Sequence, residues 1–269
     1  MSDTNVLPFL ELPSRQNKPR GDGLTMMIDG GLPLQYFVDL VASHGEFMDF
    51  VKFGWGTSMV TKDLRSKIRA LAKADIDFYF GGSLFEKSLV QNRFEQFRAF
   101  CRDMGASFVE VSNGTIDLDD TDKASYVAEL AKDFRVISEV GLKDQTKSDV
   151  MYPATWIKCI NADLDAGAHL VTLETRESGH AGLCRSNGEL RYGLIEEILT
   201  SGVDVSRLLI EAPSHYLQNY FVRRVGANVN LGNIAASDVL GLETIRLGLR
   251  SETLLAFEVS STPQKLALQ

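Results

Sequence analysis

The chain has 269 residues, of which 44% are hydrophobic and 24% are charged, and its formal net charge is −8. The acidic balance argues against nucleic acid or an anionic membrane as the main partner, because both need a basic surface, although a local site can still bind a small anion. No apolar run approaches a transmembrane helix, no signal-peptide pattern opens the chain, and the scattered Cys101, Cys159 and Cys184 favour neither a disulfide framework nor a zinc site. We therefore expect a cytoplasmic protein.

Short apolar runs, each followed by a segment of helical period, recur along the chain. We expect strands at 24–29, 48–53, 76–80, 108–112, 135–140, 169–174, 208–211 and 228–231. Apolar spacing near 3.6, as in Leu64, Ile68 and Leu71, predicts helices between them. Eight such units predict an α/β fold, a single (β/α)8 TIM barrel, over 23–257. An N-terminal arm (1–22) would precede it, closing the base or contacting a neighbouring molecule, and a C-terminal tail (258–269) would follow.

Charged or amide residues end most of the predicted strands. Catalytic residues of a TIM barrel lie at the C-terminal ends of its strands, so we expect a ring at the barrel mouth made of Asp29, Lys52, Glu110, Glu139, Glu174, Glu211 and Asn230. Its five carboxylates would repel one another unless protons or cations compensate. Lys52, Lys143 and Arg176 could do so, as could a divalent metal, and oxygen ligands favour Mg²⁺ over zinc. Any single acid could instead be structural, but a ring that is structural throughout is disfavoured.

Loops after the strands supply candidate anion donors. Glycines allow close approach of a ligand to the backbone, and the region after strands seven and eight is the usual phosphate site of this fold. Trp55 and Trp156 are expected to pack rather than to bind. The substrate-binding candidates are Gly54, Thr57, Ser58, Gly82, Ser83, Ser112, Arg176, Ser178, Gly232 and Asn233, together with Asp29, Glu211 and Asn230 of the ring.

Several segments, in order along nearly the whole barrel, resemble the phosphosulfolactate synthase family. They are KFGWGTS (52–58), GGSLFE (81–86), VEVSNG (109–114), EVGLK (139–143), ETRESG (174–179), EAP (211–213) and NLGNI (230–234). KFGWGTS is the most specific of these pieces. The resemblance implies a Mg²⁺-dependent TIM-barrel lyase that adds sulfite to phosphoenolpyruvate, giving 2-phospho-3-sulfolactate on the route to coenzyme M.

The resemblance also implies roles for individual residues. Lys143 would be the general acid, with Lys52 as a second candidate or an anion ligand. Glu110, Glu139 and Glu174 would be the metal or metal-water ligands, with Asp29 near, and Glu139 would also belong to the catalytic group. Arg176 would make a bidentate contact to phosphate or carboxylate. A homo-oligomer is expected, with a trimer among the candidate states.

Some loop positions depart from the family pattern and keep two alternatives open. Ser83 replaces a threonine, Asn113 an acid and Leu142 a lysine. One alternative is a related enzyme that uses a different nucleophile or a different enol or carboxylate acceptor. The other is a non-catalytic homologue of the heat-stress-associated relatives. The joint presence of Lys52, Lys143, Arg176 and the carboxylates favours an enzyme.

Overall fold

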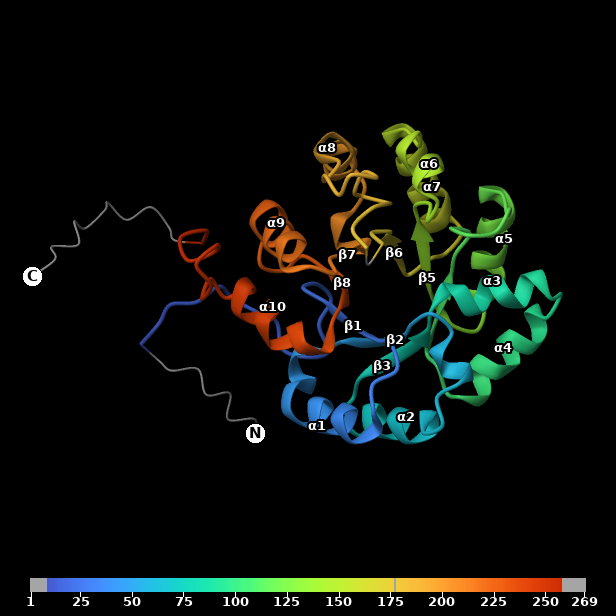
Figure 1. Cartoon of the computed structure of the whole chain (residues 1–269), viewed down its shortest axis with the longest axis horizontal. Helices are drawn as coiled ribbons and strands as arrows, with labels where there is room; N and C mark the ends of the chain where they lie inside the picture. Colours follow the sequence, from blue (N-terminus) through green and yellow to red (C-terminus); the bar gives the residue numbers. More distant parts are fainter. Residues whose placement is uncertain (1–8, 177, 258–269) are drawn as a thin grey trace, which may run out of the picture.

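The computed structural model describes residues 9–176 and 178–257, and its centre is a nearly closed barrel of parallel strands wrapped by helices (Figure 1). The strands are β1 (Thr25–Asp29), β2 (Phe50–Phe53), β3 (Asp77–Phe80), β4 (Phe108–Val111), β5 (Arg135–Val140), β6 (Leu170–Leu173), β7 (Leu208–Glu211) and β8 (Leu231–Ile234). Their order is β3-β2-β1-β8-β7-β6-β5-β4, which leaves one seam between β3 and β4. The predicted TIM barrel is therefore confirmed. Residues 1–8 of the predicted arm and the predicted tail (258–269) lie outside the described residues.

Helices follow the strands and cover the outside of the barrel. They are α1 (Leu34–His44), α2 (Leu64–Lys73), α3 (Gly82–Val90), α4 (Phe94–Asp103), α5 (Asp120–Leu130), α6 (Gln145–Asp149), α7 (Pro153–Asp165), α8 (Tyr192–Thr200), α9 (His215–Val225) and α10 (Val239–Arg246). Among the described residues, no helix combines the length and apolarity that crossing a membrane would require.

The eighth strand is the one that the sequence placed wrongly. It was expected at 228–231, but β8 begins at Leu231. Asn230 lies just before the strand, where its side-chain oxygen accepts from the amide of Leu24 at 3.0 Å and its side-chain nitrogen donates to the carbonyl of Leu208 at 3.0 Å. Because both partners stand at the starts of their strands, Asn230 belongs to the base of the barrel and not to its mouth.

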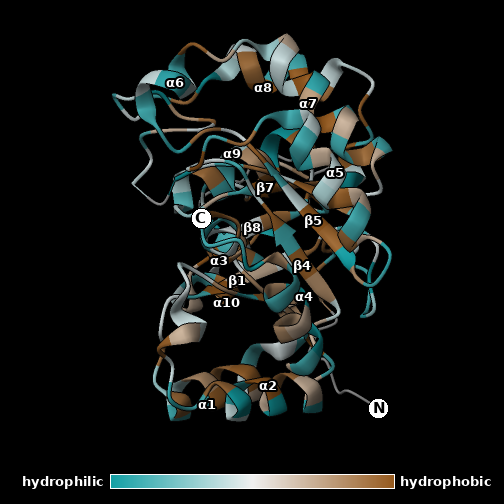
Figure 2. Cartoon of the chain, turned by 90° about the vertical axis from the view of Figure 1, so that its right-hand side faces the viewer, coloured by the Kyte–Doolittle hydropathy of each residue, from teal (hydrophilic) through white to brown (hydrophobic). Residues whose placement is uncertain are grey.

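Two apolar layers pack on the two faces of the strands. One fills the barrel interior and consists of Leu24, Met26, Phe50, Tyr79, Phe108, Ile137, Leu170 and Leu209. The other lies between the strands and the helices, and β4 and β5 carry hydrophobic colour along much of their length (Figure 2). Each buried Leu or Phe stabilises the fold by about 1.5–3 kcal/mol. Because side chains alternate along a strand, the residues two positions after Phe50, Phe108, Ile137 and Leu209 form a polar layer on this apolar floor.

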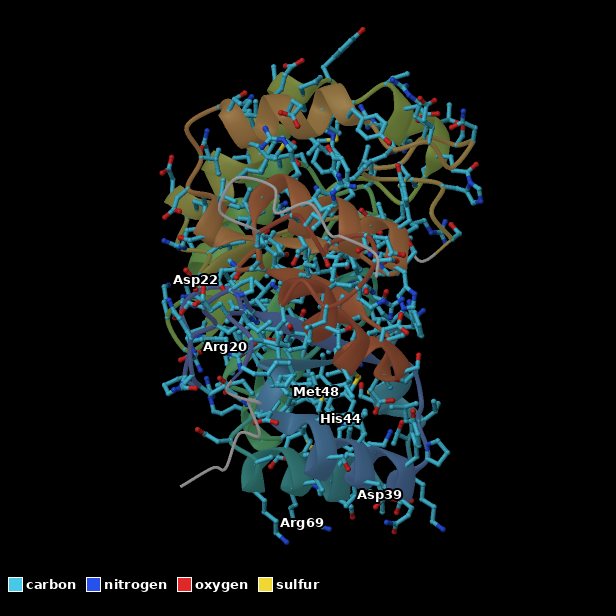
Figure 3. The ribbon with its side chains drawn as sticks, turned by 90° about the vertical axis from the view of Figure 1, so that its left-hand side faces the viewer. Arg20, Asp22, Asp39, His44, Met48 and Arg69 are labelled. Atoms are coloured by element: carbon cyan, nitrogen blue, oxygen red, sulfur yellow. The ribbon has the colours of Figure 1, made fainter. Side chains whose placement is uncertain are left out.

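The described part of the N-terminal arm lies against the base of the barrel. Arg15 pairs with Glu243 of α10 at 2.9 Å, and Lys18 donates to the carbonyl of Met48 at 2.7 Å. Arg20 donates to the carbonyl of Glu46, and Figure 3 views this side of the molecule with Arg20 and Met48 labelled. Of the two roles left open for the arm, these residues perform the first, because their contacts close the base.

Candidate active site at the barrel mouth

A cavity of about 540 Å³ opens at the C-terminal ends of the strands. Its walls come from strand ends and from the loops that follow them. They are Ile28, Lys52, Trp55, Gly81, Gly82, Ser83, Glu110, Gly114, Thr115, Glu139, Lys143, Asp144, Glu174, Arg176, Ser178, Glu211 and Asn233. Most of the ring predicted from the strand ends is therefore brought together in one place.

Lys52 forms the centre of the polar layer. Its ammonium lies 3.0 Å from Glu110, 3.4 Å from Glu211 and 3.8 Å from Glu139. Burial lowers the pKa of Lys52, but the carboxylates of Glu110 and Glu211 outweigh burial, so its pKa lies well above the usual range. Lys52 is therefore a fixed positive charge that holds three acids together.

Glu110 is held from a second side by the start of α3. The amide of Gly82, the first residue of that helix, donates to its carboxylate across the seam between β3 and β4. A Cβ at Gly82 would lie 2.5 Å from the Cβ of Ser112, so only glycine allows this close approach. Burial raises the pKa of Glu110, and the charge of Lys52 opposes that rise.

Lys143 stands nearer the opening than Lys52. Its ammonium lies 2.9 Å from Glu139, and its side chain is 23% exposed, compared with 8% for Lys52. Burial lowers the pKa of Lys143, but Glu139 and Glu174 outweigh burial and raise it above the usual range. Burial raises the pKa of Glu139, but Lys143 and Lys52 reverse that shift and hold it below the usual range. This lysine is charged and faces the cavity.

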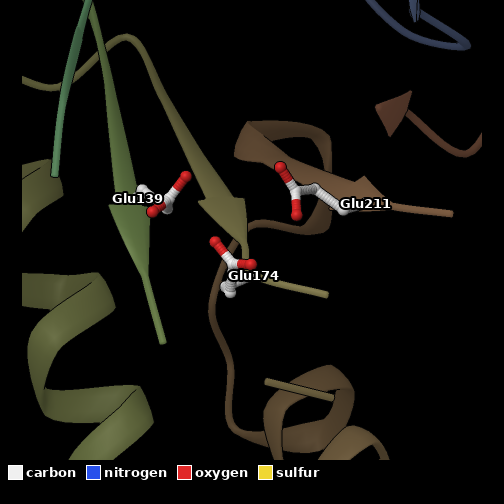
Figure 4. Close-up of side chains that lie close together, drawn as sticks. All are labelled: Glu139, Glu174 and Glu211. Carbon is white, nitrogen blue, oxygen red and sulfur yellow. The ribbon is translucent and has the colours of Figure 1, made fainter. Parts of the chain in front are cut away.

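Three carboxylates converge beside these lysines. One oxygen from each of Glu139, Glu174 and Glu211 lies within 4.8 Å of the others, and all three residues are buried (Figure 4). Burial, together with the charge of Glu139, raises the pKa of Glu174 well above its usual range and that of Glu211 to about 7. Acids so close together require protons or a cation between them, and an all-oxygen donor set suits Mg²⁺.

Polar side chains at the rim include a donor suited to an anion and an amide oxygen, which is an acceptor. Arg176 is exposed and donates to the carbonyl of Lys143 at 3.2 Å. Asn233 lies in the left-handed region, with φ of 54°, and its side-chain oxygen is buried without a hydrogen-bond partner among the described residues. Trp55, expected to pack, is instead 53% exposed and lines the cavity, whereas Trp156 is fully buried as expected.

Asp29 does not belong to the ring, and its predicted position is wrong. Met26 points into the barrel and Met27 toward the helices, so Asp29, in phase with Met27, also points outward. Its carboxylate pairs with Lys67 of α2 at 2.5 Å and accepts from the amide of Leu32 at 2.7 Å. Asp29 thus fixes the β1–α1 loop against α2.

Other predicted residues shape the walls without lining the cavity. The Thr57 hydroxyl donates to the carbonyl of Gly54 at 2.8 Å, and Ser58 is buried. A Cβ at Gly54 would lie 2.7 Å from Ile28, and one at Gly232 would lie 2.8 Å from Met26. These glycines allow their neighbours to pack closely.

Ser112 lies behind the lining and connects two acids. Its hydroxyl oxygen is 2.8 Å from Glu139 and 2.6 Å from Glu86 of α3. Glu86 was missed as a site residue, although its position four residues after Gly82 puts both on one helical face. Tyr79, also missed, lies in the barrel beneath the acids, and burial raises its pKa well above the usual range. Other lining residues that the sequence did not single out are Ile28, Gly81, Gly114, Thr115 and Asp144.

Comparison with known proteins gives a consistent result. Residues 13–252 match the family described as (2R)-phospho-3-sulfolactate synthase (ComA). The chain is 46% identical to phosphosulfolactate synthase of Bacillus subtilis (strain 168) over 91% of its own length and 97% of that protein. It is 39% identical to phosphosulfolactate synthase of Methanocaldococcus jannaschii over 86% of its length and 93% of that protein. Among solved structures, 3-hexulose-6-phosphate synthase from Salmonella typhimurium matches with a TM-score of 0.52 at 13% identity, covering 84% of this chain and 100% of that one, which supports the fold alone.

Proposed function

The chain belongs to the (2R)-phospho-3-sulfolactate synthase family, and we propose that it is a lyase that adds sulfite to phosphoenolpyruvate with the help of Mg²⁺. The product would be 2-phospho-3-sulfolactate. The observation that carries the proposal is the charged Lys143 beside the cluster of Glu139, Glu174 and Glu211 in the mouth cavity.

The acidic cluster fits a divalent cation. Glu139, Glu174 and Glu211 would hold Mg²⁺, and Glu211 replaces Glu110 in the expected ligand set because one oxygen of Glu211 lies within 4.8 Å of oxygens of both Glu139 and Glu174. When bound, the ion would act as a Lewis acid for the negative charge that develops on the substrate carboxylate.

Lys143 is the proposed proton donor. The sulfur of sulfite forms a bond to the methylene carbon of phosphoenolpyruvate, and the electron pair of the double bond moves toward the neighbouring carbon and its carboxylate. The Nζ atom of Lys143 then gives its proton to that neighbouring carbon, and the neutral amine recovers a proton from solvent. The carboxylates of Glu139 and Glu174, which raise the pKa of Lys143, keep it in the protonated form that can donate.

The remaining cationic groups hold the substrate and balance charge. Arg176 is exposed at the rim, where its planar guanidinium can bind phosphate through two donors, and the hydroxyls of Ser83 and Ser178 line the same cavity. Lys52 is too deeply buried, and too closely surrounded by acids, to be the second proton donor. Its proposed role is to hold Glu110 and Glu211 next to each other and to oppose the rise that burial causes in their pKa.

The cytoplasmic location and the oligomeric state of the protein stay predictions. Cys101, Cys159 and Cys184 are free and buried, which suits a reducing cytoplasm. That the protein forms a homo-oligomer also stays a prediction, and sedimentation equilibrium would measure its mass in solution.

A phosphorus-NMR experiment tests the proposed reaction. Purified protein is mixed with phosphoenolpyruvate, sulfite and Mg²⁺, and each component is omitted in turn. We expect a new phosphate-ester signal that requires all three and appears without release of inorganic phosphate. A signal that forms without sulfite, or the absence of any new ester in the complete mixture, would contradict the proposal.

A further inference from the structure

Arg191, which immediately precedes α8, carries a buried charge outside the cavity. Its residue is 7% exposed. Its guanidinium donates to the carbonyl of Ser148 at 2.8 Å, of Met151 at 2.7 Å and of Gly182 at 3.3 Å. In the part of the chain that the structure describes, no carboxylate lies within ion-pair distance of it.

Burying such a group is unfavourable unless its hydrogen bonds repay the loss of water. Burial, together with the nearby charge of Arg185, lowers the pKa of Arg191, and the charge of Asp149 opposes that shift. An apolar residue of similar volume could fill the same space, but the carbonyls of Ser148, Met151 and Gly182 would lose this donor. The function of Arg191 should therefore be sought in the segments whose carbonyls it joins.

Those carbonyls belong to two segments beside the proposed chemistry, the α6 segment (145–151) and the β6–α8 loop. Ser148 lies in α6 and Met151 just after it, and this segment follows Lys143 within a few residues. Gly182 lies in the loop between β6 and α8, which also carries Arg176. The two segments are also joined directly, because the amide of Gly182 donates to the hydroxyl of Ser148 at 2.9 Å.

Gly182 also contacts the backbone of an acid in the site. Its φ is +73°, and a Cβ there would lie 1.9 Å from the carbonyl oxygen of Glu174. The next residue, Leu183, donates its amide to that same oxygen at 2.9 Å. The hydrogen bond from Arg191 to the carbonyl of Gly182 thus helps to hold this loop against the end of β6, beside Glu174.

We propose that Arg191 is a positioning residue of the active site, which joins the α6 segment (145–151) to the β6–α8 loop so that Lys143, Glu174 and Arg176 keep a fixed spacing around the substrate. The assignment of that substrate rests on the proposed function. Displacing a substrate-binding group by about 1 Å can reduce the rate by about 10²-fold, so a joint outside the cavity can control turnover.

The test compares Arg191→Met and Arg191→Lys with Arg185→Met, a control in the same loop whose side chain is exposed. We expect Arg191→Met to lower kcat/KM by about 10- to 100-fold, with a clear rise in KM for phosphoenolpyruvate. Lysine should recover part of the loss, because its ammonium can donate three hydrogen bonds to carbonyls. The control should match the wild-type protein. If Arg191→Met does not fold, Arg191→Lys carries the test, with a smaller rise in KM.

A second readout does not depend on activity. Trypsin cuts after Arg176, and a loop released from Arg191 should be cut there faster in Arg191→Met than in wild type or Arg185→Met. An unchanged cleavage rate, or faster cleavage with unchanged KM and kcat, would overturn the inference. If the wild-type protein makes no phosphate ester, the proposed function fails, and the cleavage rates alone decide whether Arg191 joins the two segments.

Discussion

The two ends of the barrel both bury charged side chains, yet they match those charges differently. At the base, Arg246 is fully buried and donates to the carbonyls of Ala227 at 2.6 Å, Val229 at 2.7 Å and Leu24 at 3.1 Å. At the mouth, Lys52 has three acids around it, and Glu174 joins two of them without an ion pair of its own among the described residues.

The charged side chains at the base stabilise the fold, whereas those at the mouth are available for chemistry. The base pairs its groups individually, as in Arg15 with Glu243 and Arg20 with Asp49. The mouth buries Glu139, Glu174 and Glu211 together, and burial, with the charge of Glu139, raises the pKa of Glu174 and Glu211. Such an excess of buried acid is unfavourable for the isolated chain, and a bound cation would offset it; strongly shifted pKa values of this kind gather at functional sites.

The largest expected effect is at the mouth, in Lys143→Ala. Losing a general acid should lower kcat by about 10²- to 10⁴-fold, and the thermal unfolding midpoint should also fall, because the buried carboxylate of Glu139 loses its partner at 2.9 Å. Initial rates from phosphorus NMR measure the first quantity and circular dichroism the second. The matched control is the exposed Lys147→Ala in α6. Retained turnover in Lys143→Ala would remove this lysine from the mechanism.

A smaller effect is expected from Glu174→Gln. Replacing one carboxylate of the cluster should raise the Mg²⁺ concentration needed for half-maximal activity by about tenfold or more. In metal-free protein the same change should raise the unfolding midpoint, because it removes an acid that its neighbours repel. Titration of activity with Mg²⁺ and thermal unfolding in chelator test the two parts. An unchanged Mg²⁺ requirement would exclude Glu174 from the ligand set.

The stability of the metal-free protein should also depend on pH through Glu211. Its pKa rises from 4.5 to about 7 on folding, so the folded state binds the extra proton more tightly. The resulting stability is fully present below the unfolded pKa and is lost as the pH rises through the folded pKa, a change of about 3–4 kcal/mol at most.

Urea unfolding in chelator at about pH 5 and about pH 8 measures this loss. Glu211→Gln should reduce the difference between the two conditions, and saturating Mg²⁺ should reduce it in the wild-type protein, because the cation then replaces the proton. A wild-type difference that neither the substitution nor Mg²⁺ alters would show that other groups cause it.

The positions of the mouth residues could be predicted only where the sequence shows which face of the strand points into the barrel. Glu110, Glu139 and Glu211 each lie two residues beyond an apolar residue of the barrel interior, so alternation along their strands placed them correctly. Asp29 failed because Met26, Met27 and Ile28 are apolar on both faces, as strands of parallel sheets are. Such a run does not reveal which face is inside.

Other failures arose where position depends on contacts between distant segments. Val229 and Leu231 continue an apolar alternation across the start of β8, so the pattern did not show that Asn230 bonds to Leu24 before the strand begins. Glu86 and Arg191 reach their places from a helix and from a long loop. Nothing local in the sequence specifies that Ser112 or Gly182 will be their partners.

The smallest expected effect belongs to the base, in Arg246→Met. The substitution leaves the carbonyls of Ala227 and Val229 without their donor, which should cost about 1–3 kcal/mol, partly offset because a buried cation is also removed. Urea unfolding should therefore show a loss of stability, while KM and the Mg²⁺ requirement stay at wild-type values in conditions where the variant is folded. A variant that kept full stability but lost Mg²⁺ activation would contradict the division between a structural base and a functional mouth, because it would couple the charges of the two ends through the apolar floor that separates them.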